Sequence, residues 1–474
     1  MRLKLLTLAL ALAAVSLPGH GEDLLDAYHE ARANDPVLSQ ADATRLSVGE
    51  NVNQARALLL PQISAGLGLT QTSGSGNSAS QSGLGTSGND FLCSGIAAGT
   101  GTYDCSGPLA TDGSLGTSGH QRSRSISATL NQTIFDFSKI ADLRVAHSQA
   151  SAQDELYDAA AQDLYVRVAT AYFGVLTSED QLTFAKANED AFRKQYEQSD
   201  QRFKVGLSAV TDVYQAKAFY EAAKAQTITA QNTLYDAKEA LTQITNKPTG
   251  ELKRLREDLP LNPPSPNDAD AWVKDAMKYN PTLKSQNDNV QAAERSITAA
   301  RAGHLPTINA SLSRGKTSTW AENGGSDFSG NGRYGNTIGV TLSVPIFSGG
   351  ATQSRVRQSI DQRDAANDAM EIQRRQVERD TLNFYRSVIS GISEVQSGKA
   401  SVEAGQKALD ATRAGFGVGT KTITDVLLSI QTLTSSESSY SQARHQFILN
   451  KLLLKQAAGT ADLKDLEAIN ALLQ

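Results

Sequence analysis

The chain has 474 residues, a formal net charge of −5 and an aromatic content of 6%. This mildly acidic balance argues against nucleic acid as a partner. Few aromatic residues and many small polar ones suit long helices with thin contacts better than one thick hydrophobic core.

The N-terminus has the pattern of a secretory signal peptide over residues 1–21. Arg2 and Lys4 precede an apolar stretch, and Gly19 and Gly21 occupy the small-residue positions before a cleavage site. Cleavage removes two cations, so the mature chain carries −5 − 2 = −7. Beyond this leader no continuous apolar run reaches the roughly 20 residues that a membrane helix needs. No Cys follows the cleavage site, which argues against a lipid anchor.

The only two cysteines, Cys93 and Cys105, lie in a long loop predicted over 71–121 that is rich in Gly, Ser and Thr. In an exported protein we expect them to form a disulfide. Closing so short a loop contributes roughly 3 kcal/mol in the chain-entropy description. The alternative is a pair of free thiols.

Two diverged copies of one unit make up the chain. The segment Ala55–Pro61 recurs as Ala300–Pro306, at an offset of 306 − 61 = 245 residues. Val205–Val213 recurs as Val418–Val426, at an offset of 418 − 205 = 213 residues. The first copy therefore carries a longer insertion between these two landmarks.

A proline-rich stretch divides the two copies. We assign residues 22–246 to the first repeat, 247–268 to a linker and 269–474 to the second repeat, which ends in a C-terminal helix. Clustered prolines cannot continue a helix or a central strand, so they mark a connection.

Each repeat contains two segments that alternate apolar and polar residues with the period of a strand. These segments are 63–70, 126–134, 308–313 and 338–346. Their polar positions are small and uncharged, which is typical of a membrane β-barrel with its apolar side toward lipid. A soluble four-stranded sheet is the alternative. Four strands cannot close a barrel, since small barrels need about 8, so closure requires several chains.

Long stretches without proline follow the strands, at 137–203 and 351–416. Helical spacing over about 67 residues predicts a helix of ~100 Å, more than three times the ~30 Å of a bilayer's hydrocarbon core. Gly206 and Gly419 stand where each long helix must turn, because glycine readily adopts the left-handed conformation that ends helices. A second helix is predicted after each turn.

No constellation in the sequence supports catalysis or a cofactor. The six histidines show no metal-ligand spacing. Gly315-Lys316-Thr317 hints at a phosphate loop, but Ala310 stands where the motif needs its first glycine. We therefore predict a protein that is not an enzyme.

The chain resembles the TolC family of outer-membrane efflux and export ducts. The matching segments are Gln132-Thr-Ile-Phe-Asp136, Val344-Pro-Ile-Phe347, Gln201-Arg-Phe-Lys-Val-Gly-Leu207, Gly415-Phe-Gly-Val-Gly-Thr420, Thr211-Asp212 and Thr424-Asp425. The resemblance covers essentially all of the mature chain. It implies a homotrimer in the cell outer membrane, with four strands per chain in a 12-stranded barrel and a helical coiled-coil tunnel that spans into the periplasm. The loop over 71–121 would then be extracellular.

The resemblance also assigns the partners and the function. It implies an exit channel of a tripartite efflux pump or of a type I secretion system, which passively conducts drugs or secreted proteins from an inner-membrane transporter. Apart from outer-membrane lipid, the expected partners are that transporter and a periplasmic adaptor, or membrane fusion, protein. The alternative from another class is a self-standing diffusion porin or a structural surface protein, neither of which needs ~100 Å of periplasmic helix.

The family pattern places the adaptor-docking surface at the two helix tips. Its residues are Val205, Gly206, Leu207, Val418, Gly419 and Thr420.

The resemblance further implies a periplasmic gate, in which Asp425 from three chains forms an anionic ring. Like charges in such a ring disfavour simultaneous ionisation and attract cations. Where members often have a second Asp, this chain has Leu428, so the second ring would close by excluding water. Phe416 and Lys421 replace the Tyr and Arg of the closing network.

Because these replacements lose a hydroxyl and a bidentate guanidinium, we expect a looser network between Lys421 and Thr211 or Asp212. A purely structural role for these residues is the alternative to the gate. Thr422 and Asp425 have the spacing of a helix capping pair, so Asp425 either caps its helix only or both caps and gates. For Asp212 a local role at the helix start is expected.

Overall fold

The computed structural model of the chain describes residues 22–74, 119–323 and 326–474. The predicted signal peptide, and Cys93 and Cys105 with their predicted disulfide, lie outside the described residues. The chain divides into two compact units. Of the described residues, the helical unit comprises 22–55, 140–301 and 349–474, and the strand unit comprises 56–74, 119–139, 302–323 and 326–348.

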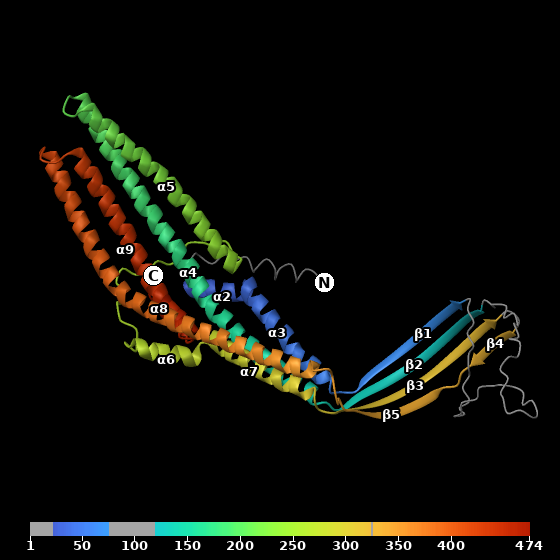
Figure 1. Cartoon of the computed structure of the whole chain (residues 1–474). Helices are drawn as coiled ribbons and strands as arrows, with labels where there is room; N and C mark the ends of the chain where they lie inside the picture. Colours follow the sequence, from blue (N-terminus) through green and yellow to red (C-terminus); the bar gives the residue numbers. More distant parts are fainter. Residues whose placement is uncertain (1–21, 75–118, 324–325) are drawn as a thin grey trace, which may run out of the picture. The chain divides into compact units, whose positions relative to one another are not determined.

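The described helices include four long ones that form two hairpins. They are α4 (Phe137–Lys204), α5 (Val210–Thr245), α8 (Ala351–Gly417) and α9 (Ile423–Ala457). The shorter helices are α2 (Leu24–Asn34), α3 (Pro36–Ala57), α6 (Ala269–Tyr279), α7 (Pro281–Ala302) and α10 (Leu463–Asn470). Figure 1 shows the α4–α5 and α8–α9 hairpins. No described helix combines the length and apolar composition of a membrane-spanning segment.

The starts of α4 and α8 are set by a capping carboxylate and by two glycines, respectively. Asp136 caps the start of α4, because its carboxylate accepts a hydrogen bond from the backbone N–H of Ser138 at 3.0 Å. Gly349 and Gly350 adopt φ values of +61° and +83° just before α8, which a residue with a Cβ rarely does. Within these limits neither helix contains a proline. Lengths of 68 residues for α4 and 67 for α8 agree with the predicted stretches.

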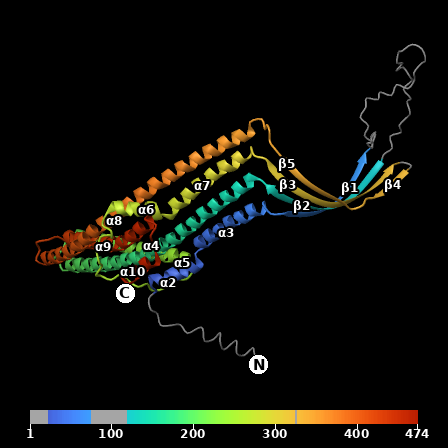
Figure 2. The same ribbon diagram turned by 90° about the horizontal axis from the view of Figure 1, so that it is seen from below.

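Within the helical unit, α3, α4, α7 and α8 lie side by side (Figure 2). Polar contacts join the neighbours: Ser151 of α4 donates to Asp288 of α7 at 2.6 Å, and Gln373 of α8 donates to Thr282 of α7 at 3.2 Å. The main hydrophobic cluster is centred on Tyr172 and Phe173 of α4. Both side chains are fully buried, so the middle of α4 forms the core of the unit.

The stretch 247–268 contains no described helix or strand. Two isolated β-bridges connect this stretch to the two ends of the described chain: Leu252 pairs with Glu22, and Leu255 pairs with Leu473. The Tyr172 hydroxyl lies 3.0 Å from the carbonyl oxygen of Glu22 and 2.9 Å from that of Lys253. A buried phenol thereby holds the N-terminal segment and this stretch against α4.

The strand unit is one antiparallel sheet in which the fourth strand is interrupted. Its strands are β1 (Gln62–Gly74), β2 (Gly119–Phe135), β3 (Thr307–Asn323), β4 (Ser326–Asn331) and β5 (Gly335–Ser343). The order is β1, β2, β3, and both β4 and β5 pair with β3 (Figure 1). A Cβ on Gly332, between β4 and β5, would stand 1.9 Å from the carbonyl oxygen of Thr317. The backbones therefore approach closely at this break, and only glycine fits.

The four predicted strand segments are all present, with different limits. The first three extend further toward the loops than predicted, because polar residues continue the ladder after the apolar alternation ends. The fourth stops at Ser343 instead of Ile346, because Pro345 has no N–H to donate. Ile346 and Phe347 remain 94% and 89% exposed.

Candidate functional site

The two hairpin tips have the same backbone turn. At the first tip Gly206 adopts φ +77°, and the N–H of Leu207 donates to the carbonyl of Arg202 at 2.8 Å. At the second tip Gly419 adopts φ +80°, and the N–H of Thr420 donates to the carbonyl of Gly415 at 2.9 Å. This is the helix-ending motif in which a left-handed glycine satisfies the last carbonyls.

Both tips expose apolar side chains at their ends. Val205, Leu207 and Val418 are 69%, 70% and 77% exposed. Exposed aliphatic residues in groups mark contact surfaces more often than isolated ones do. The tips thus combine a fixed backbone with an uncovered apolar surface.

The helices that follow the two turns begin differently. At the second tip Thr422 and Asp425 form a reciprocal capping box at the start of α9. The Asp425 carboxylate accepts from the backbone N–H of Thr422 at 2.8 Å and from its hydroxyl at 2.9 Å. These two hydrogen bonds hold the pKa of Asp425 below its usual value.

At the first tip the N-cap position of α5 is Ala209, whose methyl group cannot accept a capping hydrogen bond. Asp212 instead accepts a hydrogen bond from the Ser208 hydroxyl at 2.8 Å. Asp212 therefore takes part in a local contact at the helix start, without a capping box.

The remaining predicted gate residues are only partly brought together. Among the described residues no hydrogen bond or ion pair joins Lys421 to Thr211 or Asp212. Phe416 lies under the guanidinium of Arg202, 4.8 Å from the ring centroid, which is a cation–π contact between the two hairpins. An aromatic ring without a hydroxyl thus still connects α8 to α4.

Sequence reasoning missed two residues that join the hairpins, Arg202 and Gln215. Gln215 of α5 accepts a hydrogen bond from the Thr424 hydroxyl of α9 at 3.2 Å. No local pattern indicates such contacts, since the partners are 209 residues apart in the chain. The only available signal was the alignment of the two tips as repeats.

Behind the tips lies a second hydrophobic cluster that includes Phe192, Leu409 and Ile430. Val426 and Leu427 at the start of α9 are fully buried in it. Leu428 is 49% exposed, and it lies one helical turn from Asp425 on the same side of α9.

The exposed side of α9 continues beyond Leu428 with small hydroxyl residues. Thr432, Ser435 and Ser439 recur at steps of three and four residues and are all exposed. Residues at this spacing share one helix face. The helix therefore presents an uncharged polar stripe opposite its buried face.

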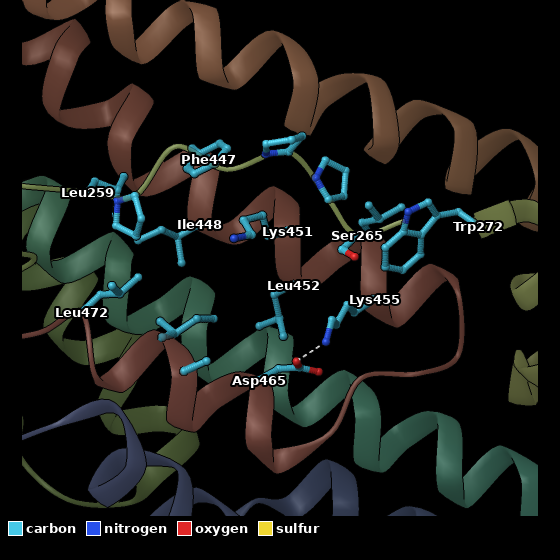
Figure 3. Close-up of a pocket in the computed structure, with 16 residues that line it drawn as sticks. Leu259, Ser265, Trp272, Phe447, Ile448, Lys451, Leu452, Lys455, Asp465 and Leu472 are labelled. Atoms are coloured by element: carbon cyan, nitrogen blue, oxygen red, sulfur yellow. Dashed lines mark hydrogen bonds and ion pairs between the residues drawn. The ribbon is translucent and has the colours of Figure 1, made fainter. Parts of the chain in front are cut away.

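A cavity of about 330 Å³ lies elsewhere in the helical unit, between α9, α10 and the proline-rich stretch. Figure 3 shows its mainly apolar lining, with Trp272, Phe447 and Leu452 around it and the ion pair of Lys455 with Asp465 at its edge. Burial lowers the pKa of Lys451, which also lines the cavity. The lining holds no nucleophile with an adjacent base. Among the described residues no cluster of His, Cys, Asp or Glu is suited to a metal ion.

Comparison with known proteins agrees with this geometry. The family model described as outer membrane efflux protein matches residues 27–247 and 272–460. The outer membrane protein TolC of Escherichia coli (strain K12) is 32% identical over 98% of this chain and 87% of its own length. The alkaline protease secretion protein AprF of Pseudomonas aeruginosa is 28% identical over 94% of this chain and 86% of its own length.

Solved structures show the same fold at low sequence identity. The outer membrane protein VceC of Vibrio cholerae superposes with a TM-score of 0.69 at 18% identity, covering 92% of this chain and 96% of that one. The Campylobacter jejuni CmeC outer membrane channel gives a TM-score of 0.68 at 14% identity, covering 97% and 95%.

Two repeated helix hairpins with glycine tips, combined with a strand pair from each repeat, form the fold that these solved channels share. The family model and the 32% identical relative define the class as outer-membrane exit channels. The chain belongs to the outer membrane efflux protein family. It is an outer-membrane duct for efflux and secretion and not an enzyme.

Proposed function

We propose that three copies of the chain form one channel, which passively conducts drugs or secreted proteins from an inner-membrane transporter to the outside. The observation that carries this proposal is the pair of glycine tips with exposed aliphatic side chains, each at the end of a helix of 67 or 68 residues. A channel with such tips can receive cargo at a distance from the membrane that holds its strands. Because the site contains no reactive group, the energy for transport comes from the partner.

The open edges of the sheet support a shared barrel. Among the described strands β1 pairs only with β2, and β5 pairs only with β3. The outer backbone groups of both edges therefore lack partners, which is costly in lipid. Three chains with four strand positions each give 3 × 4 = 12 strands, above the about 8 needed for closure.

The uncharged stripe of α9 supports a conducting interior. Leu428, Thr432, Ser435 and Ser439 present neither cations nor anions. A pore lined in this way binds no charged cargo tightly, so cargo of either sign can leave. We assign this stripe to the tunnel wall.

For the gate we propose that Asp425 and Leu428 of three chains form two successive rings. The capping bonds lower the pKa of Asp425 within each chain and so oppose the rise that three neighbouring carboxylates would cause; the first ring is then anionic and attracts cations. The second ring is apolar and closes by excluding water. Lys421, Thr211 and Asp212 would then connect neighbouring chains, while Phe416 with Arg202 connects the two hairpins of one chain.

For the tips we propose docking of a periplasmic adaptor protein that links the channel to the inner-membrane transporter. Gly206 and Gly419 fix the turns, and Val205, Leu207, Val418 and Thr420 supply the contact surface. Exposed aliphatic side chains at a rigid turn suit packing against an apolar helical hairpin.

The docking proposal is tested in cells that depend on this chain for export. Leu207→Glu with Val418→Glu should abolish resistance to exported toxic compounds and secretion of substrate proteins, because charges enter an apolar contact. Arg355→Gln with Lys399→Gln, at exposed positions of α8, makes the same charge change of −2, serves as the matched control and should retain both activities. Equal amounts of each variant in the outer membrane are verified by immunoblotting.

A photo-crosslinker at Leu207 should capture the adaptor, and one at Lys399 should not. Retained export by the tip variant, or transport into liposomes by the purified chain without any partner, would support a self-standing porin instead.

A further inference from the structure

The sheet has two chemically different faces. The register places Leu67 of β1 beside Ile126 of β2, and Leu130 of β2 beside Leu312 of β3. Residues paired in this way lie on the same face. This apolar face comprises Ile63, Leu67, Leu69, Ile126, Leu130, Leu312, Ile338, Val340 and Leu342.

The opposite face is small and polar. Gly66 lies against Ser127, and a Cβ on Gly68 would meet the hydroxyl of Ser125 at 2.6 Å. The apolar face is uncovered: Leu69, Ile338 and Val340 are 76%, 81% and 67% exposed. In an outer-membrane channel the apolar face is therefore the lipid face.

Four cations interrupt the apolar face, at positions that run from the middle of β3 to the loop end of β2. They are Arg122 and Arg124 of β2 and Arg314 and Lys316 of β3, and we call them the basic patch. Their register shows the shared face, because Lys316 lies opposite Ile126 and Arg314 lies opposite Ala128.

The members of the basic patch are neighbours on the sheet. Arg124 lies opposite Ser318, so Lys316 is its diagonal neighbour, at a separation of roughly 7–8 Å between such positions. Long side chains reach across this distance. The four cations therefore form one cluster across two strands.

Two aromatic residues border the basic patch. Trp320 lies opposite Arg122 in the register and is 43% exposed. The ring of Tyr334 lies 5.5 Å from the guanidinium of Arg314 and 5.9 Å from the ammonium of Lys316. Tyr and Trp concentrate where a membrane's hydrocarbon meets its headgroups. The position of Trp320 opposite Arg122 predicts that the loop-end side of the patch lies at headgroup level, from where the long side chains of the other cations can extend toward it.

No ion pair or hydrogen bond joins the four side chains of the basic patch to any side chain that the structure describes. β1, β2 and β5 contain no Asp or Glu, and the acids of the neighbouring strands, Glu322 of β3 and Asp327 of β4, lie beyond Trp320 toward the loop end of β3. Unpaired cations at the edge of an apolar surface are unfavourable unless an anion outside the chain neutralises them. A ligand that touches both surfaces must carry acyl chains and an anionic headgroup.

Arginine favours phosphate, since its planar guanidinium forms two parallel hydrogen bonds with it. A single phosphate would leave most of four positive charges uncompensated. The charge count therefore fits a headgroup with more than one phosphate. Soluble anions lack the acyl chains that the adjoining apolar face would cover.

We propose that the basic patch binds a multiply phosphorylated membrane lipid in the outer leaflet, with its phosphates on Arg122, Arg124, Arg314 and Lys316 and its chains along the apolar face. The assignment to the outer leaflet rests on the proposed function, because it requires the helix tips to point into the periplasm. The binding itself requires only that the apolar face contact lipid.

The experiment uses the full-length chain extracted in mild detergent and analysed by native mass spectrometry. The probe is a lipid A that carries two phosphates, titrated beside its dephosphorylated form, phosphatidylglycerol and inorganic phosphate. We expect the wild type to retain the bisphosphorylated lipid through detergent exchange. Changing all four cations of the patch to Gln should weaken retention at least about tenfold, through the loss of charge-assisted hydrogen bonds.

The matched control replaces four exposed cations of α8 with Gln, at Arg355, Arg357, Lys399 and Lys407. It makes the same charge change and should bind the lipid as the wild type does. The smaller variant Arg124→Gln with Lys316→Gln covers failure of the fourfold variant to fold, and should lose retention in part. Conductance in planar bilayers is recorded for each variant, so that a failed channel is distinguished from a failed lipid site.

Equal retention by the patch variant and the wild type would overturn the proposal. So would equal binding of the dephosphorylated lipid, or competition by inorganic phosphate at the concentration of the lipid. Phosphatidylglycerol bound as tightly as the bisphosphorylated lipid would refute the requirement for more than one phosphate.

Discussion

The two repeats share their turns but not the contacts that begin the following helix. Gly206 and Gly419 have nearly the same φ, yet Thr422 caps α9 whereas its equivalent, at 422 − 213 = 209, is Ala209. The backbone turn depends on glycine and has been retained in both copies, while the side chains around it have diverged. A shared fold therefore does not imply a shared role for Asp212 and Asp425.

A second difference lies where the short helices of each repeat meet. Asp35 precedes α3, and its equivalent before α7, at 35 + 245 = 280, is Asn280. Burial alone would raise the pKa of Asp35, but hydrogen bonds from Arg167 and from the backbone N–H of Leu38 lower it. Asn280 instead donates to the carbonyl of Ala457 at 3.0 Å. One repeat uses an ion pair where the other uses a neutral amide.

This difference between the repeats predicts the largest effect on the free energy of unfolding. Arg167 binds the carboxylate of Asp35 through two nitrogens, at 3.0 and 2.6 Å, and Asp35 is only 4% exposed. Arg167→Ala leaves that carboxylate buried and unpaired, so we expect a loss of about 3–5 kcal/mol in the free energy of unfolding. Asn280→Ala should cost about 1–2 kcal/mol. Denaturant unfolding followed by far-ultraviolet circular dichroism measures both, and equal losses would contradict the comparison.

The next effect concerns His445, whose equivalent in the first repeat, at 445 − 213 = 232, is the exposed Asn232. His445 is 4% exposed, and its Nδ1 lies 2.8 Å from the Thr177 hydroxyl. Burial lowers the pKa of His445 to about 4, from an ordinary 6.5.

Below pH 6.5 the unfolded chain binds a proton that the folded chain excludes, so stability falls as the pH drops toward 4. The loss reaches about 3 kcal/mol at most. Thermal unfolding from pH 7 to pH 4 measures it. His445→Gln should flatten the dependence, whereas Asn232→Gln, the control, should not. An unchanged slope for His445→Gln would show that His445 does not titrate in this way.

A smaller effect is expected from exchanging the caps of the two repeats. Thr422→Ala removes the hydroxyl of the capping box and should destabilise the chain by about 1 kcal/mol. Ala209→Thr should stabilise it by up to about 1 kcal/mol, because Asp212 already stands three residues later and can complete a box. Hydrogen exchange at the first turns of α5 and α9 resolves the two sites. Equal exchange in both variants and the wild type would mean that the caps do not differ.

Much of this fold is predictable from the sequence because its signals are local. The absence of proline over α4 and α8, the glycines at the tips and the alternation in the strands each depend on neighbouring residues. The break at Gly332 was not predicted, because a close approach to Thr317 leaves no mark in the alternation. The contact of Arg202 with Phe416 was also missed, because the two residues are far apart in the sequence and belong to different repeats.

The most direct test of the gated duct is single-channel conductance of the purified full-length chain in planar bilayers. We predict a small wild-type conductance that multivalent cations block from the tip side. Arg202→Ala with Gln215→Ala should raise the conductance several-fold by loosening the contacts between hairpins, and Asp425→Asn should abolish the block. The same conductance and the same block in all three proteins would contradict a gate at the tips.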